Sequence, residues 1–570
     1  MRKLLAIFGL IFWVCVAPVF AGVAPERAPR AMVVSIHPEA SRVGAEVVRQ
    51  GGNAVDAAVA TGFALAVVHP AAGNIGGGGF LLLRFANGET HFVDFREKAP
   101  LKATEKMYLD AQGKVVEGLS LYGYKAIGVP GSVAGLAHAQ KKWGRLSLKQ
   151  VMAPAIKLAR DGFPLTYRDA EELQDPDLAK FAESRRVFQR DGNFYKQGEV
   201  FRQPELARTL ERIAADPNDF YKGKLAQEIA ATLQEGGALI TADDLAKYEV
   251  KERKPVRGTY RSYEIISAPP PSSGGVALIE TLNILEGYRV GNTGARSADS
   301  IHLTAEAFRR VFDDRAEFMG DPDFSHIPVA QLIDKRYAAK WRESLNPDKA
   351  SVSAELRRPD FGEMDVTASA RVLARESENT THYSVVDTAG NAVAVTTTLN
   401  DSFGSRVTAE GLGFLLNNEM DDFSSGPGIP NAYGLIQGQA NSIAPGKRPL
   451  SAMTPTIVLN EGKLYLVLGS PGGPSIITTV ANILIGVVDF GLNLQEAVNA
   501  PRFHHQWMPD ELRIENVGLS PDTIKLLEQK GHKIDRRNYY GDAECIAIDQ
   551  KTGERLGAAD FRNGGAAVGF

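Results

Sequence analysis

The chain has 570 residues, of which 23% are charged and 44% hydrophobic, and its formal net charge is −4. This is the composition of an ordinary globular protein, and the slightly acidic balance without basic runs argues against nucleic-acid binding. Two cysteines, Cys15 and Cys545, are too few for a disulfide-stabilised scaffold. Stability must come from core burial, which a chain of this length can supply.

The N-terminus predicts export. A short basic start, Met1-Arg2-Lys3, is followed by an apolar run over 4–20 and by the small-residue cleavage site Val19-Phe20-Ala21. A membrane anchor is the alternative, but the apolar run is short for a bilayer crossing and no cluster of positive charge follows it. We expect residues 1–21 to be a signal peptide, the protein to be periplasmic or secreted, and no later segment to span a membrane.

The remaining elements predict sheets covered by helices. Apolar spacing near 3.6 residues predicts helix in the first part of the chain, over 40–68, 148–164 and 203–215. From residue 380 the period changes to alternation, which predicts strands at 382–387, 392–399, 454–459, 463–470 and 544–549. Helices are expected again at 476–485 and 522–531. No linker or repeat divides the chain, so one large domain or two closely packed halves are expected.

Common catalytic and cofactor motifs are missing from the sequence. There is no G-x-S-x-G, H-E-x-x-H or P-loop motif and no cysteine-rich metal spacing. The glycine run over 73–79 lacks the spacing of a dinucleotide loop, and we interpret it as a place of close backbone approach. His504 and His505 are adjacent and therefore point different ways, which is not typical of a metal pair. No metal and no cofactor are expected.

The segment ESENTTHYSVVD, residues 376–387, contains a candidate nucleophile. A threonine that begins a chain carries its own base, because its free α-amine has a reference pKa of about 8. This chemistry requires the bond between Asn379 and Thr380 to be cut. The alternative is that Thr380 and Thr381 merely lead into a β-hairpin, where threonine is common. The residues alone leave both interpretations open.

Seven sequence blocks, in order along the chain, carry a resemblance to a known family. They are 94–97 (DFRE), 269–275 (PPPSSGG), 380–387 (TTHYSVVD), 417–423 (NNEMDDF), 447–451 (KRPLS), 469–473 (GSPGG) and 500–505 (APRFHH). Through them the chain resembles the bacterial γ-glutamyltranspeptidases, also called glutathione hydrolases, of the N-terminal nucleophile hydrolase superfamily.

The resemblance implies the fold and the subunits. The expected class is α+β with four layers, αββα, in which two stacked antiparallel sheets lie between helix layers. Cleavage between Asn379 and Thr380 would give a large subunit, 22–379, and a small subunit, 380–570, which together form one intertwined domain.

The resemblance also implies catalytic roles. Thr380 is the expected nucleophile, Thr398 hydrogen-bonds it, and the N–H groups of Gly472 and Gly473 stabilise the tetrahedral oxyanion. Glycine suits a place where the main chain approaches the reacting carbon, and Pro474 at a helix start would place those amides at a positive dipole end. Without the resemblance, Thr398 would be an ordinary strand residue and the glycines an ordinary turn.

Substrate recognition is implied for a further set of residues. Arg96 would bind the α-carboxylate of a γ-glutamyl group through its planar fork. The α-ammonium of the γ-glutamyl group would be held by Asn400, Glu419 and Asp422. Ser451 is a further expected substrate-binding residue, and Tyr433 would close over the site as part of a lid loop. The alternatives are a surface salt bridge of Arg96 with Glu97 or Asp94, and a helix-end or loop charge at Asp421-Asp422.

One position departs from the family pattern. Ala452 follows Ser451, where a second serine is usual. Loss of that hydroxyl would remove a charge-assisted hydrogen bond worth roughly 1.5–3 kcal/mol.

The expected function is that of a self-cleaving exported γ-glutamyltransferase and hydrolase. It would cleave glutathione and related compounds through a γ-glutamyl ester of Thr380 and pass the acyl group to water, an amino acid or a peptide. One alternative is a glutaryl or cephalosporin acylase of the same superfamily. Another is an exported binding protein that does not react.

Overall fold

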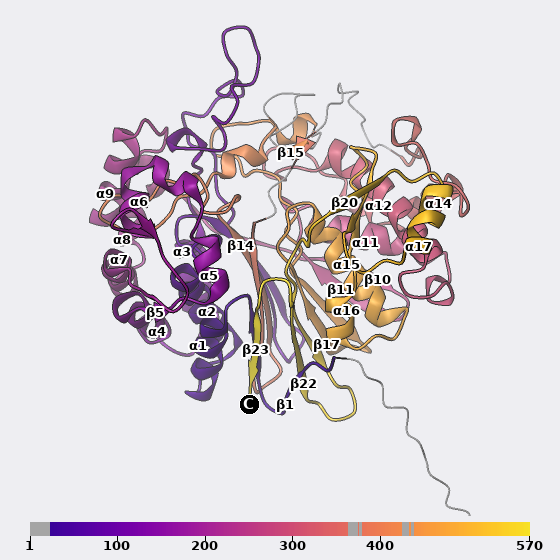
Figure 1. The fold of residues 1–570 in the computed structure, drawn as a ribbon, viewed down its shortest axis with the longest axis horizontal. Coiled ribbons are helices and arrows are strands. Elements are labelled where there is room, and N and C mark those ends of the chain that lie inside the picture. Colours follow the sequence, from indigo (N-terminus) through magenta and orange to yellow (C-terminus); the bar gives the residue numbers. More distant parts are fainter. Residues whose placement is uncertain (1–22, 363–373, 376–378, 425–432, 435–437) are drawn as a thin grey trace, which may run out of the picture.

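Two seven-stranded sheets lie face to face between layers of helices (Figure 1). The computed structural model describes residues 23–362, 374–375, 379–424, 433–434 and 438–570, with backbone alone at 374–375 and 433–434. The α+β, four-layer expectation is therefore confirmed. The expected signal peptide over 1–21 lies outside the described residues.

Every strand pair within these two sheets is antiparallel. The first sheet has the order β1 (Glu26–Ala28), β22 (Arg555–Ala559), β21 (Glu544–Ile548), β17 (Lys463–Leu468), β16 (Thr456–Asn460), β11 (Tyr263–Ser267) and β10 (Val256–Tyr260). The second has the order β23 (Ala566–Gly569), β2 (Met32–Ser35), β13 (Thr381–Val386), β14 (Ala392–Thr398), β3 (Gly78–Arg84), β4 (Thr90–Asp94) and β9 (Lys251–Arg253).

Helices cover the outer face of each sheet. The second sheet is covered by α1 (Pro38–Arg49), α2 (Ala54–Val68), α3 (Ser132–Trp143), α4 (Leu148–Asp161), α7 (Pro204–Ala215) and α9 (Lys224–Glu235). The first is covered by α11 (Gly274–Leu285), α12 (Ala298–Phe318), α14 (Lys335–Glu343), α15 (Ser475–Val488), α16 (Leu494–Asn499) and α17 (Pro521–Gln529). Among the described helices, none is long and apolar enough to cross a membrane.

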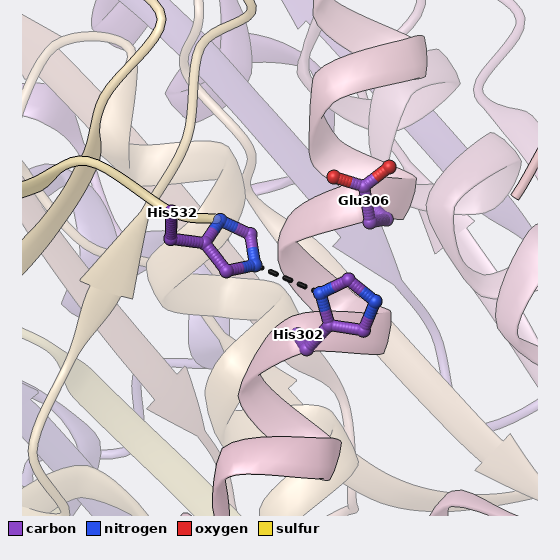
Figure 2. A group of neighbouring side chains, drawn as sticks. All are labelled: His302, Glu306 and His532. Carbon is purple, nitrogen blue, oxygen red and sulfur yellow. Dashed lines mark hydrogen bonds between the residues drawn. The ribbon is translucent and has the colours of Figure 1, made fainter. Parts of the chain in front are cut away.

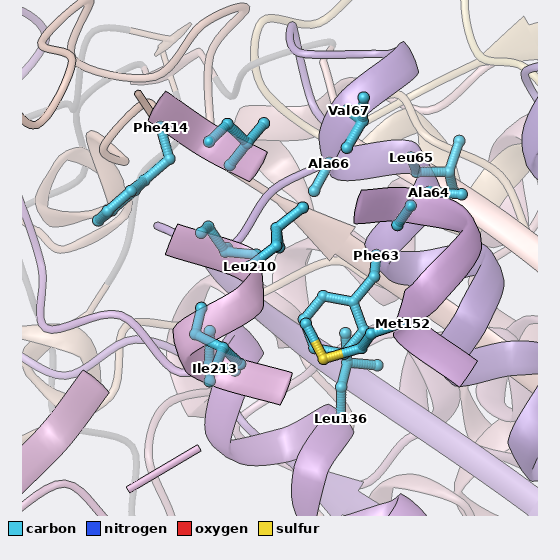
Figure 3. Close-up of a cluster of buried hydrophobic side chains, with 14 of the residues drawn as sticks. Phe63, Ala64, Leu65, Ala66, Val67, Leu136, Met152, Leu210, Ile213 and Phe414 are labelled. Atoms are coloured by element: carbon cyan, nitrogen blue, oxygen red, sulfur yellow. The ribbon is translucent and has the colours of Figure 1, made fainter. Parts of the chain in front are cut away.

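Three apolar layers hold this stack together. The central one fills the space between the sheets with side chains such as Phe80, Ile457 and Ile546. In one of the outer layers, Phe63 of α2 packs among side chains from α3, α4 and α7, including Leu136, Met152 and Leu210 (Figure 3). Helix α2 is buried along its whole length, which explains why its sequence is apolar on every side.

The predicted elements are found with small shifts, and one of them is divided. The run 40–68, expected to be helical, forms two helices because Gly51 has a positive φ of 95° and Asn53 begins α2 with a capping box. The expected hairpin over 382–399 is confirmed as β13 and β14. Its turn is held by Asp387 Oδ1, which accepts hydrogen bonds from the N–H groups of Ala389 and Asn391.

Candidate active site

Two threonines stand together at one end of the β13–β14 hairpin. Thr380 directly precedes β13, and Thr398 ends β14. The Thr398 hydroxyl donates to the carbonyl oxygen of Asn379 at 3.0 Å, and its oxygen lies 3.4 Å from the Thr380 hydroxyl. It also accepts from the N–H of Asn400 at 2.9 Å. Of the three acceptors within reach of the Thr398 hydroxyl, the carbonyl of the predicted cleavage site is the nearest, ahead of the Thr380 hydroxyl and the Asn400 carbonyl.

The glycine run over 73–79 lets strand β3 approach this hairpin closely, as expected from the sequence. A Cβ atom placed at Gly77 would lie 2.0 Å from the carbonyl oxygen of Thr398. At Gly78 it would lie 2.5 Å from the carboxylate of Glu97. Any side chain at these positions would displace either Thr398 or Glu97.

Arg96, which follows β4, gathers three carboxyl groups around one guanidinium. It forms ion pairs with Glu419 and Asp422, and Glu97 lies 3.7 Å from its Nη1. Its Nη2 also donates to the carbonyl oxygen of Leu450 at 3.0 Å. Arg96, Glu97 and Glu419 are almost completely buried. The structure thus brings Arg96, Glu419 and Asp422 together, and it adds Glu97 to them.

The charges of this cluster do not balance, because one cation faces three acids. Burial raises the pKa of Glu97 to about 7, although Arg96 opposes the shift. Burial also raises the pKa of Glu419 well above its ordinary value, with Glu97 and Asp422 adding to the effect against the attraction of Arg96. The site therefore has spare capacity for a second positive charge.

The two adjacent acids of the NNEMDDF block face different ways. Asp422 pairs with Arg96, whereas Asp421 accepts a hydrogen bond from the hydroxyl of Ser120. Burial raises the pKa of Asp421 to about 7. Of this pair, only Asp422 lines the cavity beside Arg96.

That cavity, called here the Arg96 cavity, unites most of the predicted site residues. Its volume is about 20 Å³ in the uncleaved chain, which is room for roughly one water molecule. Asn400 adopts a positive φ of 77°, a conformation uncommon for a residue with a side chain. The cavity is lined by Arg96, Thr380, Thr398, Asn400, Glu419, Asp422, Ser451, Ala452, Met453, Gly473 and Ile476.

The glycine turn before α15 presents its amide groups next to this cavity. Gly472 and Gly473 have φ values of 129° and 53°, which favour glycine. Gly473 lines the cavity, and Gly472 is its neighbour in the same turn. Within the described part of the chain, neither N–H donates a hydrogen bond. Helix α15 begins at Ser475 with Pro474 as its N-cap, as expected.

Tyr433, the predicted lid residue, is described only by its backbone. It lies in the short strand β15 (Tyr433–Gly434), which pairs with β12 (Ala374–Arg375), so that Tyr433 is opposite Arg375. The position of its side chain lies outside the described residues.

Ser451 is held by a block that sequence reasoning treated only as part of the resemblance. The N–H and hydroxyl groups of Ser273 both donate to the Ser451 carbonyl, at 2.7 and 2.8 Å. The Ser451 hydroxyl accepts from the N–H of Met453 at 3.1 Å, which leaves its proton available to a ligand. The PPPSSGG block was the signal for Ser273, and Glu97 belongs to the DFRE block, although no role in the site was assigned to it.

A separate cluster places possible metal ligands close together. His302, Glu306 and His532 have ligand atoms within 4.8 Å of one another (Figure 2). However, His302 Nδ1 and His532 Nε2 share a hydrogen bond of 2.8 Å, and Glu306 accepts from Arg309 and Arg310 at 3.0 and 2.8 Å. Two guanidinium groups beside the carboxylate oppose cation binding, so the arrangement is that of a structural hydrogen-bond network.

Comparison with known proteins agrees with this geometry. The family model described as Gamma-glutamyltranspeptidase matches residues 40–570. The glutathione hydrolase proenzyme of Pseudomonas sp. (strain A14) is 48% identical, covering 96% of each chain. That of Escherichia coli (strain K12) is 48% identical, covering 95% of this chain and 91% of the relative. The structure of a cephalosporin acylase from Bacillus halodurans is similar with a TM-score of 0.84 and 26% identity, covering 98% of this chain and 99% of that one.

The four-layer fold, with a buried threonine at the start of a central strand, is that of the N-terminal nucleophile hydrolases. Within that class, the chain belongs to the gamma-glutamyltranspeptidase family. It is accordingly an enzyme, and the alternative of an unreactive binding protein is not supported.

Proposed function

We propose that this chain is made as a precursor that cuts itself between Asn379 and Thr380. The processed enzyme then transfers the γ-glutamyl group of glutathione and related amides to water, an amino acid or a peptide. The names of its relatives support the precursor and the substrate, because those at 48% identity are glutathione hydrolase proenzymes.

The observation that carries the substrate assignment is the charge of the Arg96 cluster. A γ-glutamyl group ends in an α-carboxylate and an α-ammonium. The carboxylate can take the guanidinium of Arg96, while the ammonium supplies the positive charge that Glu419 and Asp422 lack. A glutaryl group would bring only a further negative charge into a site that already holds three acids, so this geometry favours the zwitterion.

The contacts of Thr398 support a mechanism for self-cleavage. The Thr380 hydroxyl oxygen attacks the Asn379 carbonyl carbon, and the C–N bond between the two residues breaks as an ester forms. Thr398, which donates to that carbonyl oxygen, stabilises the developing negative charge. The hydroxyl proton passes to the released amine of Thr380. Water then hydrolyses the ester and leaves Asn379 with a free carboxylate.

The same hydroxyl acts again on the substrate. The freed α-amine of Thr380 accepts the hydroxyl proton as the oxygen bonds to the γ-carbonyl carbon, and then gives a proton to the leaving amine. The N–H groups of Gly472 and Gly473, which donate to none of the described residues, are suited to the oxyanion. Water or an amine then takes the acyl group from the ester. Since the Arg96 cavity has room for about one water in the uncleaved chain, we expect cleavage to open it.

The proposed subunits, 22–379 and 380–570, would remain tightly associated. Each sheet combines strands from both sides of the cleavage site: β13 and β14 lie between β2 and β3, and β22, β21, β17 and β16 lie between β1 and β11. Separating the subunits would break both sheets. The N-terminal sequence supports export to the periplasm or the medium, with removal of residues 1–21.

Replacing Thr398 tests its role in self-cleavage. Thr398→Val removes the donor to the Asn379 carbonyl but keeps the shape of the side chain. We expect the rate of cleavage to fall by about a hundredfold, the loss typical of one oxyanion donor. The rate is measured from the decay of the precursor band on denaturing gels.

Thr398→Ser is the matched control because it retains the hydroxyl. It should cleave at a rate much closer to that of the unchanged protein. Cleavage of Thr398→Val at the unchanged rate would show that this hydrogen bond plays no part.

Two substrates that differ only in the ammonium group test the proposed function. The processed enzyme should turn over γ-glutamyl-p-nitroanilide with a kcat/KM at least about tenfold above that for glutaryl-p-nitroanilide, since a lost charged hydrogen bond costs about 1.5–3 kcal/mol. Release of p-nitroaniline measures both. Equal values would favour the acylase alternative.

A further inference from the structure

A second cavity meets Thr380 on the side away from Arg96. Its volume is about 200 Å³, roughly ten times that of the Arg96 cavity. Its walls include His37, His69, Arg168, Glu172 and Thr380. The two cavities have only Thr380 in common among their lining residues. The turn before α15 separates them, because Pro471 lines the second cavity and Gly473 lines the first.

The geometry of acyl transfer gives this second cavity a place in the reaction. When the Thr380 oxygen attacks a γ-amide, the carbon bears three other groups. The glutamyl chain runs toward Arg96, and the oxyanion faces the glycine turn. The amine that leaves, or the amine that enters in its place, then needs a third space beside Thr380, and the second cavity provides one.

The charged groups of this cavity show what it can recognise. His37 Nε2 lies 3.4 Å from Asp169, and His69 Nδ1 lies 3.2 Å from Glu172, so these two carboxylates already have partners. Burial lowers the pKa of His69, but the charge and hydrogen bond of Glu172, together with the charges of Asp169 and Asp542, outweigh it, and the net shift is upward. The shift favours the charged form of the imidazole, which lies beside the Glu172 carboxylate.

Arg168 is the cation that remains. It lies on the short helix α5 (Tyr167–Glu172), is exposed, and forms no ion pair within the described part of the chain. Its side chain lies beside Gly564, where an added Cβ atom would be 3.4 Å from the Arg168 Nε. Glu171 lines the same wall, is exposed, and forms no ion pair with any described residue. The spare charges are therefore one of each sign, which suits an amino acid or a dipeptide with a free carboxylate.

We propose that the second cavity binds both the amine released from the donor and the amino-acid or dipeptide acceptor, and that Arg168 pairs with their free carboxylate. This inference rests on the proposed acyl transfer. It makes Arg168 a determinant of acceptor specificity, distinct from the residues that bind the γ-glutamyl group.

Acceptors with and without a carboxylate test this role. Transfer from γ-glutamyl-p-nitroanilide is measured with glycylglycine and with glycylglycinamide, using cleaved, purified enzyme. Arg168→Ala should raise the KM for glycylglycine by about threefold to tenfold, the range expected for one exposed charge-assisted contact, and change that for the amide less than twofold. Arg168→Lys should lie between, because it keeps the charge but not the fork.

Arg208→Ala, on the exposed face of α7, is the matched control for loss of a surface arginine. The role of Arg168 would be overturned if cleaved, active Arg168→Ala had an unchanged KM for glycylglycine, or equal rises in KM for both acceptors. The proposed function would stand in that case. Absence of p-nitroaniline release from the unchanged protein would instead overturn the proposed function.

Discussion

Thr380→Ala is expected to remain a single uncut chain and to lose at least about a thousandfold in turnover of γ-glutamyl-p-nitroanilide. The substitution removes the oxygen that attacks the Asn379 carbonyl and, later, the γ-carbonyl of the substrate. Without cleavage, the α-amine of residue 380 also stays in a peptide bond and cannot serve as a base. Denaturing electrophoresis and a p-nitroaniline assay measure the two effects separately.

The neighbouring threonine provides the matched control. The Thr381 hydroxyl is buried and has no hydrogen-bond partner among the described residues, so Thr381→Ala should still be cleaved. Thr380→Ser should also be cleaved, because it keeps both the hydroxyl and the prospective amine. Two fragments from Thr380→Ala would mean that another protease or nucleophile makes the cut.

Asp422→Asn is expected to abolish most of the preference for γ-glutamyl over glutaryl substrates. The carboxylate is one of the three that surround Arg96, and asparagine cannot balance the charge of an α-ammonium. We expect kcat/KM for γ-glutamyl-p-nitroanilide to fall by about ten- to a hundredfold, which corresponds to one charged hydrogen bond. The value for the glutaryl analogue should fall less or rise, because the site loses a negative charge.

Asp421→Asn separates this effect from a general loss of acidity. Asp421 is adjacent in sequence, but it bonds to Ser120 and does not line the Arg96 cavity. Its substitution should leave the ratio between the two substrates within twofold of the unchanged value. The same fall in both variants would contradict a specific role for Asp422 in binding the ammonium.

Local sequence patterns and the family blocks anticipate much of the fold. The change from helical spacing to alternation at residue 380 places β13 and β14 within one or two residues of their bounds in the structure. The break at Gly51 was missed because the apolar spacing continues on both sides of it, while the positive φ that ends the helix depends on the backbone. Capping by Asn53 is visible in the sequence only when the break is already known.

The sequence predicts some residues of the candidate site but not others. Arg96, Glu419 and Asp422 come from blocks that the family resemblance identified, and the structure brings them into one cluster. The position of Glu97 in that cluster depends on the approach of β3, which brings Gly78 against its carboxylate. The second cavity brings residues from several distant segments to Thr380, among them His37, His69, Arg168 and Gly541. Only the folded topology brings such distant segments together, so no local pattern predicts it.

N-terminal sequencing of the smaller fragment tests the central claim most directly, because nucleophile and base exist together only when residue 380 begins a chain. We predict the sequence Thr-Thr-His-Tyr-Ser, read from Thr380 onward, in every preparation that hydrolyses γ-glutamyl-p-nitroanilide. Full turnover by protein in which the bond between Asn379 and Thr380 is intact would contradict the account.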